Sequence, residues 1–269
     1  PHFYRSWNAA DEYVKDFSFS QQHNMSFSGT AGKTNYYMGL SYMGQGGVVK
    51  VNPDSYNRFS VNYSTDTEIK PWLKVRSKAL YTRTNLETPF NFGTSSYDAL
   101  YYLYRWPSIM PYGTYEGIPF RNSVTETASA SMDSDVKDYM RFSVGATFVL
   151  GIPDLTLDID YTYNLDNQHI TQRGGTVGGW DFWSGSMALV DNWAAFSRNK
   201  IDKYQYNRNY HAGNAVLRYK HTWNDAHSLN VFGGMNIEYK EVDYVNAEIR
   251  DLLDQSKPEI SLAIGDKFI

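Results

Sequence analysis

The chain has 269 residues, a formal net charge of −4 and no cysteine, which excludes disulfides, thiolate metal sites and cysteine nucleophiles. Aromatic residues make up 16% of it and hydrophobic residues as a whole only 42%, and no basic run stands out that would bind a nucleic-acid backbone. No apolar stretch approaches the roughly 18 residues of a membrane-spanning helix, so a membrane role would have to come through strands.

Alternating apolar and polar residues predict eight strands, which in chain order cover about 22–31, 35–43, 57–69, 72–83, 139–150, 155–165, 210–223 and 228–240. Short polar or Pro/Gly turns join them into four hairpins. The connections between hairpins are long, at about 44–56, 84–138 and 166–209. Long strands with short turns at one end and long loops at the other are typical of outer-membrane barrels. The pattern predicts an all-β fold, a segment of an antiparallel transmembrane β-barrel.

One face of the predicted strands carries no charged side chain, for example Tyr36, Met38, Leu40 and Tyr42 in the second strand. A lipid-facing band excludes charge because Arg or Lys at the bilayer midplane costs roughly 2–4 kcal/mol. The opposite face is charged, and its predicted lumen-lining residues are Arg58, Arg76, Arg141, Asp158, Asp160 and Arg218. We therefore expect the first face to meet outer-membrane lipid.

Aromatic residues near the strand ends predict two membrane-interface girdles. Trp72 and Trp223 lie beside short turns, whereas the ends that lead to long loops carry Tyr42, Tyr81, Tyr163, Tyr210 and Tyr239. A soluble β-sandwich shows the same alternation along its strands but has no reason for such girdles. A complete small barrel of about eight strands is a further alternative, which a closed sheet would reveal.

Two aromatic clusters in the predicted long loops are candidates for substrate or lid contact, because exposed rings can stack on sugar faces while polar neighbours bond hydroxyls. The candidates are Tyr101, Tyr104, Arg105, Trp106, Tyr112, Trp180, Asp181 and Trp183. Packing of the same aromatic residues within the loops, or against a lid, is the alternative.

The residue patterns of enzymes are missing from the sequence. The six histidines are scattered, with no His-x-x-x-His pair, and there is no Gly-x-Ser-x-Gly elbow. Asp158 and Asp160 share a face as a carboxylate pair would, but solvated lumen residues explain them as well. We expect no enzymatic activity, no metal and no cofactor.

Three consecutive stretches carry a family resemblance: QQHNMSFSG at 21–29, KTNYYMGLSYMGQGGVV at 33–49 and YNRFSVNYS at 56–64. They resemble the SusC/RagA family of TonB-dependent outer-membrane transporters from Bacteroidetes. The matching positions are His23, Asn24, Ser26, Ser28, Gly29, Tyr36, Tyr37, Tyr42, Gln45, Gly47, Tyr56, Arg58 and Asn62. The sequence departs from the family pattern at Ser6 and Thr30.

The resemblance implies a barrel of about 22 strands with a plugged lumen in the cell outer membrane. It implies active import of oligosaccharides or oligopeptides, driven by TonB and capped by a SusD-like surface lipoprotein. The alternative function is that of a secreted β-sandwich glycan-binding module. Residues 1–269 would form part of one barrel domain, supplying about eight strands. The plug, which leads to TonB, and the closing strand are expected outside this partial chain.

Overall fold

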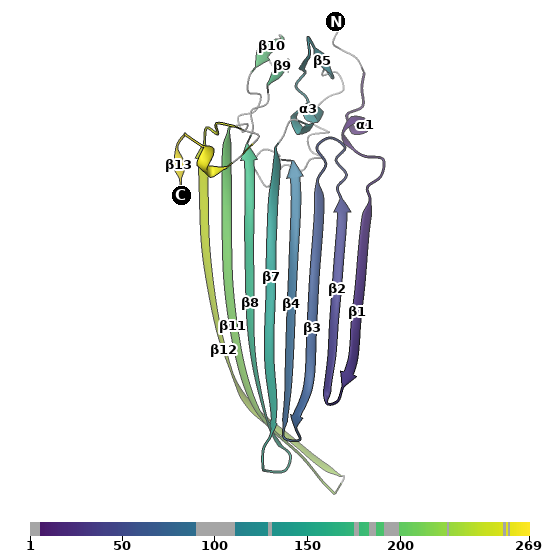
Figure 1. The fold of residues 1–269 in the computed structure, drawn as a ribbon, viewed down its shortest axis with the longest axis vertical. Coiled ribbons are helices and arrows are strands. Elements are labelled where there is room, and N and C mark those ends of the chain that lie inside the picture. The colour runs from purple at the N-terminus through teal and green to yellow at the C-terminus, as the bar shows by residue number, and fades with distance from the viewer. Residues whose placement is uncertain are drawn as a thin grey trace.

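A computed structural model of the chain describes residues 6–89, 111–128, 131–174, 178–182, 187–190, 199–224, 226–254, 257 and 259–269. Its main feature is one antiparallel sheet of nine strands in the order β1-β2-β3-β4-β7-β8-β11-β12-β13 (Figure 1). The strands are β1 (Ser20–Ala31), β2 (Thr34–Gly46), β3 (Ser55–Lys70), β4 (Leu73–Pro89), β7 (Met132–Val149), β8 (Leu155–Gly174), β11 (Lys200–Trp223), β12 (His227–Arg250) and β13 (Lys267–Phe268).

Figure 1 shows the short hairpin turns at one end of the sheet and the small elements, with both ends of the chain, at the other. We call these the turn end and the loop end. Gly32 in the first turn has a φ of 61°, which glycine adopts without a steric cost. The loop end carries α1 (Ala9–Tyr13), β5 (Thr114–Tyr115), β6 (Ile118–Pro119), α3 (Ser123–Ala128), β9 (Gly179–Asp181), β10 (Ala188–Val190) and η1 (Ile260–Leu262).

All eight predicted strands are present, but their loop ends extend beyond the predicted limits. The prediction ends the sixth strand near residue 165, whereas β8 runs to Gly174. It begins the seventh near residue 210, whereas β11 begins at Lys200, and β12 continues to Arg250. Polar side chains occupy both faces of these extensions, so no apolar alternation marks them as strands. The two longest connections are correspondingly shorter than predicted.

The strand register confirms the predicted division into two faces, because directly paired residues lie on the same face of a sheet. Ile159 of β8 pairs with Ala146 of β7 and Ala215 of β11, and these rows form the apolar face. The adjacent residue Asp160 pairs with Gly145 and Asn214, and these rows form the polar face.

Tyr210 is the exception among the predicted girdle residues. It pairs with Asn164 of β8 and Lys240 of β12, so the register places it on the polar face. Tyr163 and Tyr239 pair with His211 on the apolar face, as predicted. The prediction for Tyr210 is wrong, because the apolar alternation does not extend into residues 200–209 and so does not determine the face on which Tyr210 lies.

Within the described residues, the buried apolar clusters lie at the loop end and not in the middle of the sheet. One cluster consists of Ile201, Ile249, Leu252 and Ala263, and another of Tyr13, Val49 and Val124. On the apolar face of β12, Met235 is 63% and Ile237 is 64% exposed. No protein layer therefore covers that face in the described part of the chain.

The sheet excludes two of the alternatives for the fold. Among the described residues, β1 and β13 lie at opposite edges, so the sheet is open and not a closed barrel of eight strands. The other two sheets have only two short strands each, so the described strands do not build the second layer that a sandwich needs.

The described helices are short. None of them combines the length and the apolar character that a membrane-crossing helix needs.

Candidate functional site

The six residues predicted to line a lumen all occur in the rows of the polar face. Four of them join a chain of contacts across β4, β7, β8 and β11. Arg76 Nη2 donates to Asp160 Oδ1 at 3.2 Å, and its Nη1 donates to the Thr147 hydroxyl at 3.1 Å. Thr147 donates to Asp158 at 2.6 Å, and Arg218 lies 4.0 Å from Asp158.

Gly145 allows the Arg76–Asp160 contact to form. It lies between these two residues in the register, and a Cβ at this position would meet the Asp160 carboxylate. Arg76 of β4 can therefore reach across β7 to Asp160 of β8. The two side chains are about 38% and 45% exposed, so this ion pair positions polar groups more than it stabilises the sheet.

Arg58 and Arg141 lie on the same face outside this chain of contacts. Arg58 pairs with Met43 and Thr84. Arg141 donates from Nε to Asn164 Oδ1 at 3.0 Å and borders a hollow of about 380 Å³. A second hollow of about 320 Å³ adjoins it, and both are lined by Tyr37 and Asn62. The middle of the polar face is thus uneven, with two hollows lined in part by polar side chains.

A cluster of tyrosines occupies the polar face near the loop end. The rings of Tyr206 and Tyr244 lie 4.6 Å apart, and those of Tyr204 and Tyr244 lie 6.5 Å apart. The Arg208 guanidinium lies 5.4 Å from the centre of the Tyr206 ring and bonds Asp166 at 3.1 Å. Half of Tyr244 is exposed. A ring held in this way offers a face to a ligand.

The sequence did not point to this tyrosine cluster as a candidate site. Tyr204, Tyr206 and Arg208 recur at every second position, which is the spacing of one face of a strand. That spacing was the available signal. The residues between them, Gln205 and Asn207, are polar too, so the stretch has no apolar alternation and resembles a loop.

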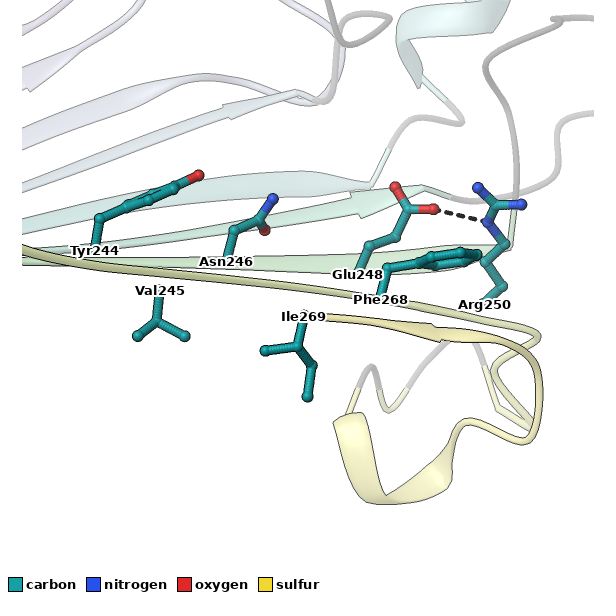
Figure 2. Close-up of a pocket in the computed structure, with 7 residues that line it drawn as sticks. All are labelled: Tyr244, Val245, Asn246, Glu248, Arg250, Phe268 and Ile269. Atoms are coloured by element: carbon teal, nitrogen blue, oxygen red, sulfur yellow. Dashed lines mark hydrogen bonds and ion pairs between the residues drawn. The ribbon is translucent and has the colours of Figure 1, made fainter.

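A pocket of about 580 Å³ extends from the tyrosine cluster along β12 (Figure 2). Figure 2 shows Tyr244, Asn246 and Glu248 on one side of the strand and Val245 on the other. The Phe268 ring lies under the Arg250 guanidinium, 4.8 Å from ring centre to Cζ. The pocket lining therefore combines aromatic rings, an amide, a carboxylate and a guanidinium with the apolar side chains of Val245 and Ile269.

The charged groups beside this pocket neutralise one another. Lys200 Nζ lies 2.7 Å from Asp202 and 3.0 Å from Glu248, and Arg250 bonds Glu248 at 2.7 Å. The hydrogen bond from Lys200 is the main reason why the pKa of Glu248 is lowered to about 2. Burial raises the pKa of Asp202, although Lys200 opposes that rise. The site has fixed charges of both signs, already paired.

Asp133 should make local stability depend on pH. Burial raises the pKa of its carboxyl to about 7 from an ordinary 3.8, although Arg173 N–H and the Gln172 amide donate to it. Between about pH 4 and 7 the folded state then binds more protons than the unfolded state, so the free energy of unfolding falls as pH rises. Asp133→Asn should flatten this dependence, measured by amide hydrogen exchange in β7 from pH 4 to 8. Equal slopes in both proteins would contradict the assignment.

The described loop candidates hold the loops together. Tyr112 stacks on Trp7 at 4.6 Å and donates to Glu12 at 3.0 Å. Trp180 Nε1 donates to the Tyr115 carbonyl at 3.1 Å. Asp181 accepts from Arg121 at 3.1 Å, with both side chains less than one-fifth exposed. The candidates outside the described residues are Tyr101, Tyr104, Arg105, Trp106 and Trp183.

Comparison with known proteins gives one weak sequence match and several structural ones. The chain is 22% identical over 231 residues to the TonB-dependent receptor P39 of Formosa agariphila, covering 84% of this chain and 20% of that receptor. No protein-family model matches the chain.

Three structures of RagAB superimpose on nearly the whole chain. The RagAB peptide transporter gives a TM-score of 0.69 at 16% identity, covering 97% of this chain and 29% of that chain. The peptide importer gives 0.68 in its open-open state and 0.63 in its closed-closed state, at 16% and 17% identity. These two cover 98% of this chain and 29% and 30% of theirs. The chain thus spans under a third of the proteins it matches.

The open sheet with one apolar and one polar face, together with these likenesses, defines a segment of an antiparallel β-barrel of the outer membrane. In such a barrel a face without charged side chains meets lipid and a charged face lines the lumen. Within that class the segment is SusC/RagA-like, as the sequence motifs indicate.

Proposed function

We propose that the chain forms part of the barrel of a TonB-dependent importer that takes up oligosaccharides or oligopeptides. The observation that carries this proposal is the tyrosine cluster on the lumen face, which lies beside paired charges and a pocket at the loop end. Aromatic rings, amides and paired charges bind both sugars and peptides. The names of the matched proteins support import, and RagAB is named a peptide transporter.

The whole described chain would then belong to one barrel domain, with the loop end outside the cell. A plug in the lumen would meet the polar face, where the Arg76–Asp160 contact and the hollow beside Arg141 offer hydrogen-bonding groups. Energy would come from TonB through parts of the protein beyond this chain. A SusD-like surface lipoprotein would cover the loop end.

The loop residues are proposed to contact this lid. Trp180 and Asp181 belong to a cluster in which Arg121, Tyr115 and Phe120 come from the other long connection. These non-covalent contacts between the two connections would make the loop end a rigid surface for a partner. Tyr112 belongs to a separate cluster with Trp7, which packs the connection between β4 and β7 against the N-terminal segment. Direct contact with cargo is proposed for the tyrosines of the lumen face.

Tyr244→Ala in the full-length protein should reduce uptake of the cargo about tenfold, because a lost ring contact is worth roughly 1.4 kcal/mol. Tyr244→Phe keeps the ring and should keep most of the uptake. The measurement is uptake of a panel of labelled oligosaccharides and oligopeptides by cells with equal surface levels of each variant. Uptake of neither class by the wild type would overturn the import proposal. Unchanged uptake by Tyr244→Ala would overturn only the site.

A further inference from the structure

A continuous polar row crosses the outward face of the barrel just beyond the lipid-facing band. It consists of Arg83, Asp138, Asn167, Asn207 and Asp243, one residue from each of β4, β7, β8, β11 and β12. The register pairs each of these residues with the next, so they form one line across five strands. We call this line the polar collar. It lies on the opposite face from the lumen, so imported cargo does not meet it.

The collar begins where the girdle tyrosines end. Tyr81 donates to Asp138 at 2.6 Å, across the junction between β4 and β7. Tyr163 donates to Asn209 at 2.9 Å, across the junction between β8 and β11. Tyrosines of this kind lie at the boundary of the hydrocarbon core, with their hydroxyls toward the headgroups. The collar is two residues beyond Tyr81 and four beyond Tyr163 and Tyr239, which is about 7 to 14 Å along the strands. That distance places it in the headgroup layer.

The chemistry of the collar favours sugars over phosphates. Asn167 carries an amide that can donate and accept, as hydroxyl-rich ligands require, whereas Asn207 can offer only its NH2 group, because its Oδ1 is buried without a hydrogen-bond partner. Two carboxylates, Asp138 and Asp243, outnumber the single guanidinium of Arg83, which already lies 3.5 Å from Asp138. A surface with excess negative charge repels a bare phosphate, whereas carboxylates and amides accept hydrogen bonds from sugar hydroxyls.

We propose that the polar collar binds the sugar headgroups of glycolipids in the outer leaflet. The proposal rests on the outer-membrane location and on the loop end facing outward, but not on what the barrel imports. It extends the lipid-facing band, an interface already defined by the fold, into the layer above it. The collar then sets the depth of the barrel in the membrane through hydrogen bonds to headgroups. The apolar rows beneath it cannot form such bonds.

The test compares three lipids bound to the purified full-length protein in nanodiscs. They are lipopolysaccharide with its core sugars, lipid A alone and phosphatidylethanolamine, each quantified by native mass spectrometry. The wild-type protein should retain more lipopolysaccharide with core sugars than lipid A or phosphatidylethanolamine. In the double variant Asn167→Leu with Asn207→Leu, the ratio of retained lipopolysaccharide to the other two lipids should fall about tenfold, as expected for two or three lost hydrogen bonds.

The matched control exchanges an asparagine pair on the lumen face of β11 and β12. Asn236 donates to Asn214 at 2.6 Å, and replacing both with Leu should leave lipid retention unchanged. If the double collar variant fails to assemble, Asn207→Ala alone should still lower the preference severalfold. Equal retention by wild type and collar variants, or a wild-type preference for lipid A alone or the phospholipid, would overturn the proposal. Uptake by the collar variants, measured separately, shows whether import itself is affected.

Discussion

Ala215→Arg should strongly impair assembly of the barrel into the outer membrane, whereas Asn214→Arg should be tolerated. Ala215 lies on the lipid-facing side between Ile159 and Met235. A guanidinium there would lie in hydrocarbon at a cost of roughly 2–4 kcal/mol. Folding into bilayers of defined lipid, followed by heat-modified gel mobility, measures the difference in assembled fraction.

Asn214 provides the matched control, because it is the next residue of β11 and lies at nearly the same depth. It pairs with Asp160 and Asn236 on the lumen face. An arginine at 214 would be hydrated and would have a carboxylate beside it. Equal assembly of the two variants, or a worse result for Asn214→Arg, would mean that the two faces have been assigned the wrong way round.

Ile201→Ala should loosen the segment from Asp251 to Gly265 on the outside of the barrel. Ile201 is fully buried against Ile249, Leu252 and Ala263, so removing its side chain leaves a cavity. Deletions of this kind cost about 2–5 kcal/mol. We expect faster amide hydrogen exchange at Leu253 and Ile264, whose N–H groups bond the Leu262 and Asp251 carbonyls.

Ile237→Ala is the control for this substitution, since Ile237 is 64% exposed on the lipid-facing side of β12. The same atoms are removed there without forming a cavity in a protein core. Exchange in the segment from Asp251 to Gly265 should match the wild type. A similar increase in both variants would mean that the Ile201 cluster does not hold the segment in place.

The sequence predicts the fold well where one face of a strand meets lipid. Ile159 and Asp160 illustrate this, because exclusion of charge from hydrocarbon enforces a strict alternation that can be counted. Tyr204 and Tyr206 illustrate the opposite case. Beyond the membrane both faces of a strand meet water, so the alternation fades although the backbone hydrogen bonds continue. The lengths of β8, β11 and β12 therefore could not be obtained from the pattern.

The candidate site was predicted in part for the same reason. The six residues predicted to line a lumen follow from the alternation, and the register places all six on one face of the sheet. The Tyr206–Tyr244 contact joins two strands in a region that carried no strand prediction, so it could not be anticipated. The stacking of Tyr112 on Trp7 depends on how two distant stretches fold over the loop end. No local pattern encodes such a contact.

In the proposed importer, the extension of β12 beyond the lipid-facing band would set the height at which cargo enters. About eleven residues separate Tyr239 from Arg250 at the end of the strand. At the usual rise and tilt of barrel strands they raise the rim by roughly 25–30 Å above the girdle. The entrance would thus lie above the membrane surface. A solute arriving from outside meets hydrogen-bonded β-sheet before it reaches the depth of the bilayer.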